Sequence, residues 1–120
     1  MASATLPRCE RIRKRIDFLS VQQRGRKLHS ENFLLFVLPR EAAAGRSPLR
    51  FGVTVTKKVG GAVVRNRIKR IARDVFRRHK SWFPTGSDVV LVAKQSAAGI
   101  DMPQAEREID RLCARCFGAR

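Results

Sequence analysis

The segment 62–80 constrains the fold more than any other part of the chain. Its apolar residues recur at i, i+4, i+7 and i+11, which is the spacing of one helical face. They are Val64, Ile68, Ile71 and Val75. At 100° per residue, these positions lie within about 60° of arc. The pattern predicts an amphipathic helix whose apolar face packs on a core supplied by other segments.

The opposite side of this helix is basic. A solvated surface helix normally mixes charges of both signs for pairing at i,i+4, but Asp74 is the only acid between residues 57 and 80. We therefore interpret this side as a surface that contacts RNA or DNA. Its polar residues are Asn66, Lys69, Arg70, Arg73, Arg77 and Lys80, with Arg65 and Arg67 on the two flanks.

A basic turn precedes the helix. It contains Lys57, Lys58, Gly60 and Gly61. Free backbone N–H groups and the helix dipole at the start of a helix favour a phosphate. The turn is not a P-loop, because the spacing G-x-x-x-x-G-K-[ST] is absent.

The charge of the whole chain supports an anionic partner. The 120 residues include 26 Lys and Arg against 10 Asp and Glu, a net charge of +16. Nucleic acid is the first candidate for such an excess and an anionic membrane surface the second. The length predicts a single domain over residues 1–120, and the charge makes it an RNA-binding domain, with 1–9 a flexible N-terminal segment. Without a secretory signal or an apolar run that could span a bilayer, we expect a cytoplasmic protein.

Three segments are predicted to be strands. Residues 32–38 and 49–55 flank a loop rich in Pro, Gly, Ala and Ser, so we expect them to pair as a hairpin. Residues 88–93 suit a short strand buried on both faces. Within 49–55, one face is apolar, whereas Gly52 and Thr54 make the other face small and polar. That second face could form the floor of a groove.

Two more helices are predicted. The first spans about 14–24 and ends at Gly25 as a C-terminal cap. Its neighbourhood offers two apolar groups, of which one can pack while the other lines a cleft: Ile12, Ile16 and Leu19, and Phe18 with Val21. The last helix spans about 103–117, starts near Asp101, and has a core stripe of Ala105, Ile109, Leu112, Cys113 and Cys116. Its acids Asp101, Glu106, Glu108 and Asp110 offset its arginines, so we expect no binding there.

No residue pattern predicts a protein active site or a protein-bound metal. Cys113 and Cys116 have the C-x-x-C form but stand at a helix end, which favours core thiols over a redox site. A zinc site lacks four plausible ligands, since only Cys9 and the two histidines are available elsewhere. His29 and His79 could act as an acid and base pair, but no third group supports them. The acids of the last helix are a poor two-metal site.

Residues 51–70, FGVTVTKKVGGAVVRNRIKR, resemble the signature of the bacterial ribonuclease P protein subunit. The resemblance includes the core Arg65-Asn66-Arg67 and the pair Lys69 and Arg70. It extends to Asp17-Phe18, Val21 and Gly25, and to length, charge and element order over most of residues 10–117.

The resemblance implies a particular fold. This is an α/β (α+β) two-layer sandwich of order αβββαβα, similar to domain 2 of ribosomal protein S5, with an extra short strand near residues 26–29. Its four-stranded mixed sheet contains a left-handed βαβ crossover through the basic helix, against the usual right-handed rule.

The resemblance also implies a function. An RNA subunit with bound Mg²⁺ cuts the 5′ leader from precursor tRNA, while the protein binds ribonuclease P RNA and precursor tRNA, with no cofactor of its own and no membrane or DNA partner. The RNA contacts fall on Lys57, Lys58, Arg65, Asn66, Arg67, Lys69 and Arg70. The leader cleft falls on Phe18, Val21 and Phe36. Gln22 stands where many members carry a second aromatic residue, which implies weaker stacking here.

Other functions remain open on the residues alone. Composition favours a basic structural RNA-binding protein, such as a ribosomal protein. A DNA-binding regulator would need a helix-turn-helix pair or a dimerisation segment, and neither is evident. A redox enzyme would depend on the two cysteines of the last helix.

Overall fold

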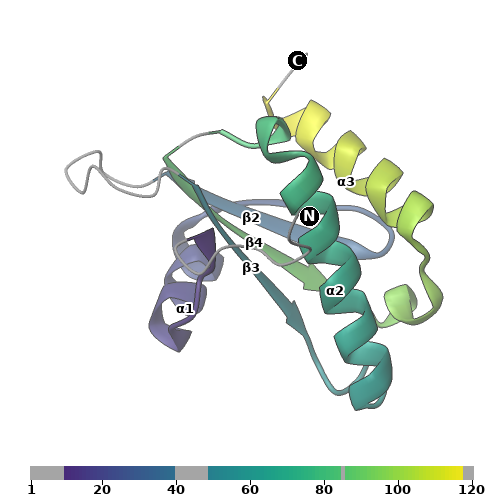
Figure 1. Ribbon diagram of the computed structural model, residues 1–120. Helices are drawn as coiled ribbons and strands as arrows, with labels where there is room; N and C mark the ends of the chain where they lie inside the picture. The colour runs from purple at the N-terminus through teal and green to yellow at the C-terminus, as the bar shows by residue number, and fades with distance from the viewer. Residues whose placement is uncertain (1–9, 40–48, 85, 118–120) are drawn as a thin grey trace, which may run out of the picture.

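The computed structural model describes residues 10–39, 49–84 and 86–117, with the side chains of 116 and 117 left out. The elements follow the implied order αβββαβα (Figure 1). They are α1 (Arg15–Arg24), β1 (Arg26–His29), β2 (Phe33–Pro39), β3 (Leu49–Val55), α2 (Ala62–Arg78), β4 (Ser87–Ala93) and α3 (Met102–Phe117). Two short 3₁₀ helices, η3 (Lys80–Trp82) and η4 (Gln95–Gly99), flank β4. The predicted segment 1–9 lies outside the described residues.

The four strands form one mixed sheet of order β1-β2-β4-β3. β2 is antiparallel to β1 and β4, and β3 is parallel to β4. The predicted hairpin of β2 with β3 is therefore wrong, because β4 lies between them. The physical reason is burial: β4 is covered on both faces and takes a central place, while β3 has one small polar face and takes an edge.

The connection from β3 through α2 to β4 is left-handed, as the resemblance implied. When the sheet is viewed with α2 in front and the two parallel strands pointing upward, β4 lies to the left of β3 (Figure 1). Most such connections are right-handed. The basic helix α2 follows the edge strand β3 in the chain and packs against it.

The larger core lies between the sheet and the pair α2 and α3. Phe51 of β3 stacks on Phe76 of α2 with ring centroids 4.3 Å apart. The apolar stripe predicted for α2 faces this core, with Ile68 and Val75 fully buried. Ala72 is buried beside them, so the stripe is continuous along the helix.

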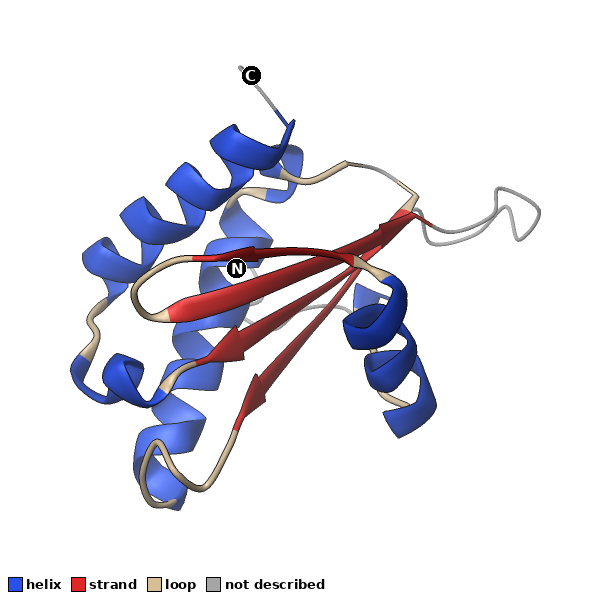
Figure 2. Cartoon of the chain, turned by 180° about the vertical axis from the view of Figure 1, so that it is seen from behind, coloured by secondary structure: helices blue, strands red, loops and turns tan. Residues whose placement is uncertain are grey.

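α1 covers the other face of the sheet (Figure 2). Val21 is buried against Phe36, whereas Ile16 is 70% exposed, so the side of α1 that packs is the one with Phe18 and Val21. Gly25 is the C-cap of α1, as predicted, and its N–H donates to the Val21 oxygen at 2.8 Å, with an extended backbone at φ −78°. A side chain there would come within 2.5 Å of the Val21 carbonyl oxygen, which requires glycine for a close backbone approach.

α3 begins one residue before the predicted start, and the Asp101 carboxylate accepts a hydrogen bond from the Gln104 N–H at 2.9 Å. Its predicted core positions from Ala105 to Cys113 are buried. Cys9 and the Cys116 side chain lie outside the described part of the chain. In that part, no helix is long and apolar enough to cross a membrane.

Candidate nucleic-acid interface

The N-terminal half of α2 presents its cations to solvent. Asn66 and Arg70 are exposed, and Lys69 is partly exposed. The two flanking arginines are held by backbone carbonyls. Arg65 Nε donates to the Gly60 oxygen at 3.2 Å, and one Arg67 Nη donates to the Ile100 oxygen at 2.5 Å. Each guanidinium has five N–H donors, so each is oriented and keeps donors for a phosphate.

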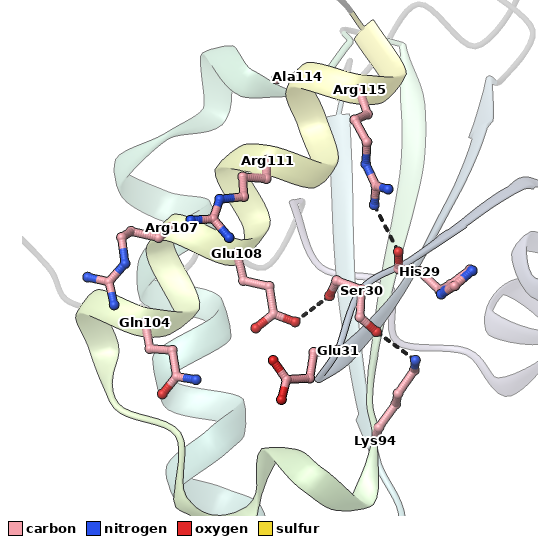
Figure 3. Close-up of a pocket in the computed structure, with 10 residues that line it drawn as sticks. All are labelled: His29, Ser30, Glu31, Lys94, Gln104, Arg107, Glu108, Arg111, Ala114 and Arg115. Carbon is pink, nitrogen blue, oxygen red and sulfur yellow. Dashed lines mark hydrogen bonds between the residues drawn. The ribbon is translucent and has the colours of Figure 1, made fainter.

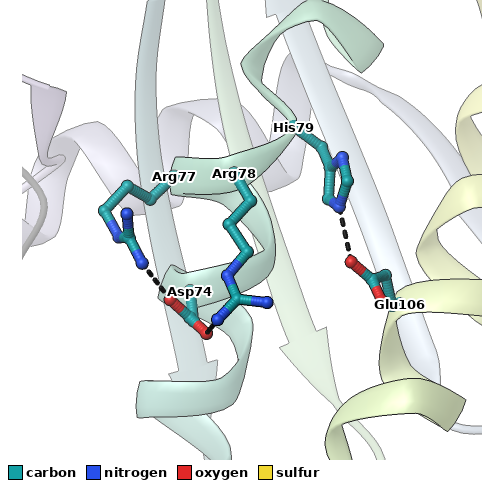
Figure 4. A network of polar contacts seen from close by, with 5 residues as sticks. All are labelled: Asp74, Arg77, Arg78, His79 and Glu106. Carbon is teal, nitrogen blue, oxygen red and sulfur yellow. Dashed lines mark hydrogen bonds and ion pairs between the residues drawn. The ribbon is translucent and has the colours of Figure 1, made fainter. Parts of the chain in front are cut away.

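The C-terminal end of α2 is electrostatically different (Figure 4). Asp74 accepts from Arg77 at 2.6 Å and pairs with Arg78 at 3.3 Å. Lys80 pairs with Glu10 at 2.6 Å. The predicted contact residues Arg77 and Lys80 therefore have carboxylate partners, and the unneutralised basic face runs from Arg65 to Arg73.

A second segment adds to this face. Glu10 to Ile12 lies along the free edge of β3, where the Ile12 N–H donates to the Phe51 oxygen at 2.9 Å. Burial lowers the pKa of Arg73, and the charge of nearby Arg11 lowers it further. Arginine starts so far above neutral pH that Arg73 remains a cation. Two like charges held near each other favour an anion between them.

The turn before α2 exposes both predicted lysines, Lys57 and Lys58, while Val59 between turn and helix is buried. Gly61 is the N-cap residue and supplies no side-chain hydrogen bond, and the first turn of α2 contains no acid. The first N–H groups of a helix have no partner within it. This end of α2 is therefore suited to a phosphate oxygen.

A groove of about 420 Å³ lies between α1 and the edge strand β3. Phe18 lines it and covers Gly52, where an added Cβ would be only 2.6 Å from the ring. Thr54 lines the same groove, which confirms that the small polar face of β3 forms a groove floor. Val21 and Phe36 are 1% and 7% exposed, so these two predicted cleft residues lie in the core below the groove.

The comparisons with known proteins identify the family. A family model described as Ribonuclease P matches residues 6–116. The chain belongs to the ribonuclease P protein family.

The ribonuclease P protein component of Desulfovibrio desulfuricans is 45% identical over 112 residues, covering 92% of this chain and 85% of its own. That of Citrifermentans bemidjiense is 40% identical and covers 98% and 94%. Among solved structures, the Staphylococcus aureus RNase P protein has a TM-score of 0.80 at 27% identity, covering 92% of this chain and 98% of its own. The Thermotoga maritima protein has a TM-score of 0.76 at 31% identity, covering 88% and 96%.

The groove in this ribonuclease P protein includes four residues that the sequence-based site prediction did not assign to it. Arg13, Arg15 and Leu19 line it beside Phe18, together with Gln22, whose contact the sequence left undecided. Leu19 is 40% exposed. Arg13 and Arg15 belong to a basic stretch, since residues 8–27 hold eight Lys and Arg against Glu10 and Asp17. That excess does not show which of the basic residues face the groove.

The histidines are not brought together as an acid and base pair. His79 Nε2 lies 2.5 Å from a Glu106 oxygen, and this contact ties the end of α2 to α3 (Figure 4). The His79 ring also stacks on Trp82 of η3, with ring centroids 3.9 Å apart. His29 stands on β1. Glu108 accepts hydrogen bonds from Asn32. Within residues 10–39, 49–84 and 86–117, no three His, Cys, Asp or Glu side chains gather as metal ligands.

Proposed function

We propose that this protein binds the catalytic RNA of ribonuclease P through α2 and the 5′ leader of precursor tRNA through the groove between α1 and β3. Family membership supports the coarser role of a protein component in a ribonuclease that processes tRNA. The observation that carries the finer role is the Phe18 ring packed against Gly52, an aromatic side chain in a groove with Arg13 and Arg15.

The groove is suited to a single strand of any sequence. Every base has a π-face, so stacking on an aromatic ring is tolerant of sequence and contributes roughly 1 to 3 kcal/mol per base. Guanidinium groups at the groove bind phosphates, which are the same in every leader. Phe18 is the one aromatic side chain among the described residues that line the groove, and Gln22 offers no second ring. Leader binding would therefore depend strongly on charge.

We assign hydrolysis to the RNA subunit and its bound Mg²⁺. Among the described residues, no three His, Cys, Asp or Glu side chains gather as metal ligands. The protein's own contribution is electrostatic and positional. With its net charge of +16, the protein reduces the repulsion between the catalytic RNA and precursor tRNA and holds the leader beside the catalytic RNA.

Cleavage of a precursor tRNA by a bacterial ribonuclease P RNA at low Mg²⁺ tests this function. The reaction is run with RNA alone, protein alone, and both together. We expect the protein to stimulate cleavage only when the RNA is present. Tight RNA binding without stimulation would instead support the alternative of a structural RNA-binding protein.

The Arg70→Ala variant is expected to weaken binding to ribonuclease P RNA. Arg70 is exposed on the basic face of α2. Losing one phosphate contact should make the plot of log K against log salt shallower by roughly 0.7 to 0.9. The matched control is Arg78→Ala, since Arg78 is on the same helix but pairs with Asp74. Equal changes in both slopes would contradict a localised contact.

Capping α2 should affect stability and RNA binding in opposite directions. A Cβ at Gly61 meets no atom within 4 Å, and the extended backbone there accepts any residue. Gly61→Asp and Gly61→Asn should each raise the free energy of unfolding by a few tenths of a kcal/mol. Both should weaken RNA binding if the helix N–H groups bind phosphate, with aspartate the worse. Unchanged affinity of the asparagine variant would exclude the N–H groups as ligands.

A further inference from the structure

A larger groove, of about 950 Å³, lies on α3, away from the surfaces described above (Figure 3). It is bounded by one side of α3 and by the turn between β1 and β2. Arg107, Arg111 and Arg115 line it from α3, and Lys94 lines it from the end of β4. Glu31 and Glu108 are its acids.

The three arginines form one stripe. They are four residues apart, which places successive side chains about 6 Å apart along the helix axis. Arg107 and Arg111 are exposed, and neither has an ion pair or side-chain hydrogen bond within the described part of the chain. Arg115 donates one N–H to the His29 oxygen at 2.8 Å, and Lys94 donates to the Ser30 oxygen at 2.6 Å. Both retain further donors.

Glu106, Glu108 and the preceding Asp101 contact groups other than these arginines. Glu106 contacts His79, and Asp101 caps the helix. Glu108 lines the groove, but it accepts hydrogen bonds from the Asn32 N–H at 2.7 Å, from the Asn32 amide at 2.8 Å and from the Ser30 hydroxyl. The sequence-based expectation that these acids offset the arginines of α3 is therefore not met by Glu106 and Glu108. Glu31 is exposed and is the remaining acid at the groove.

We propose that this α3 groove binds a second stretch of the phosphate backbone of the catalytic RNA. The proposal rests on the proposed function above. α3 packs against α2 on the same face of the sheet, whereas the groove assigned to the leader lies on the opposite face under α1 (Figures 1 and 2). The spacing of the arginines suits successive phosphates of one strand. The protein would thus contact the RNA at two separate places, on α2 and on α3.

The test compares binding of ribonuclease P RNA by the full chain and by the double variant Arg107→Ala/Arg111→Ala over a series of salt concentrations. Loss of two phosphate contacts should make the salt slope shallower by roughly 1.4 to 1.8 and weaken binding roughly tenfold at low salt. Thermal unfolding should be little changed, because both side chains are exposed. An unchanged slope would overturn the proposal.

The control is Arg24→Ala/Lys27→Ala, which removes the same charge from exposed positions outside this groove. Equal losses in the two double variants would show a general charge effect and overturn the proposal. If Arg107→Ala/Arg111→Ala weakened only the binding of precursor tRNA to the assembled complex, the groove would bind precursor tRNA instead of the catalytic RNA, and the proposal would be overturned. If the unmodified chain did not bind ribonuclease P RNA at all, the proposed function itself would fail, which is a distinguishable result.

Glu31→Gln provides an independent test with the opposite sign. It removes a negative charge from the groove without removing any donor. We expect tighter binding of ribonuclease P RNA at low salt and no difference at high salt, where the repulsion is screened. Weaker or unchanged binding at low salt would contradict a phosphate strand in this groove.

Discussion

Replacing Phe18 with alanine is expected to weaken the binding of precursor tRNA to the assembled complex by roughly tenfold, while mature tRNA binds as before. The reason is that the ring lines the groove between α1 and β3, where its Cε1 and Cζ atoms lie against Gly52. A stacked leader base would lose its aromatic surface. The measurement is the affinity of each RNA for the complex in parallel titrations.

Two further variants separate stacking from packing. Phe18 also packs against the small core under α1, so Phe18→Leu keeps the apolar contact and removes only the aromatic face. We expect it to bind leader weakly but to unfold near the temperature of the unmodified protein. Ile16→Ala is the matched control, since Ile16 is 70% exposed on the same helix and does not line the groove. Equal losses on precursor and mature tRNA would make Phe18 a core residue only.

The Arg50→Ala variant is expected to lower the free energy of unfolding by about 2 to 3 kcal/mol. Arg50 donates two hydrogen bonds to Asp88, at 2.9 and 2.7 Å, and the Asp88 side chain is only 6% exposed. Arg50 also lies 3.6 Å from Asp17, so the same guanidinium ties α1 to the sheet. The variant should loosen the wall of the leader groove as well as the sheet. Denaturant unfolding measures the first effect.

A control variant and a pH series test this interpretation. Arg78→Ala is the control, because Arg78 is 53% exposed in its pair with Asp74 and should change the unfolding free energy by about 0.5 kcal/mol or less. The hydrogen bond to Asp88 raises the pKa of Arg50. The contribution of this pair to the free energy of unfolding is therefore present below arginine's ordinary pKa and lost only far above neutral pH. Buffers up to pH 9 should leave the difference in unfolding free energy between Arg50→Ala and the unmodified protein unchanged. If Arg50→Ala lowered the free energy of unfolding no more than Arg78→Ala does, the contacts of Arg50 with Asp88 and Asp17 would not stabilise the fold as expected.

The parts of the fold that were predictable from sequence are those with a periodic pattern. α2 was predicted because its apolar positions repeat along one face, and β4 because a continuous apolar run must be covered on both sides. β1 has no such pattern, since three of its four residues are exposed. The pairing of β2 with β4 depends on which strand is buried more deeply. The prediction paired β2 with β3 because they are neighbours in sequence, and this was wrong.

In the candidate site too, a feature was predictable where a periodic pattern marks it and was not predictable where it depends on distant contacts. The alternation in β3 indicated a groove floor at Thr54, because small polar residues faced away from the core. The arginines of α3 were dismissed because acids stand next to them in sequence. Glu106 pairs with a residue 27 positions away and Glu108 with one 76 positions away, and no local pattern reports such contacts.

The central position of β4 also decides when the chain can fold. β4 is the last of the four strands to leave the ribosome. Among the strands that the structure describes, β3 pairs with β4 alone, and β2 has only β1 as a second partner. A lone hairpin of two strands is marginal in water. The sheet must therefore close in one late step through contacts between distant parts of the chain, which is slow. A nascent chain that ends before Ser87 exposes two apolar strands, and a chaperone that covers them would have to release them to the arriving β4.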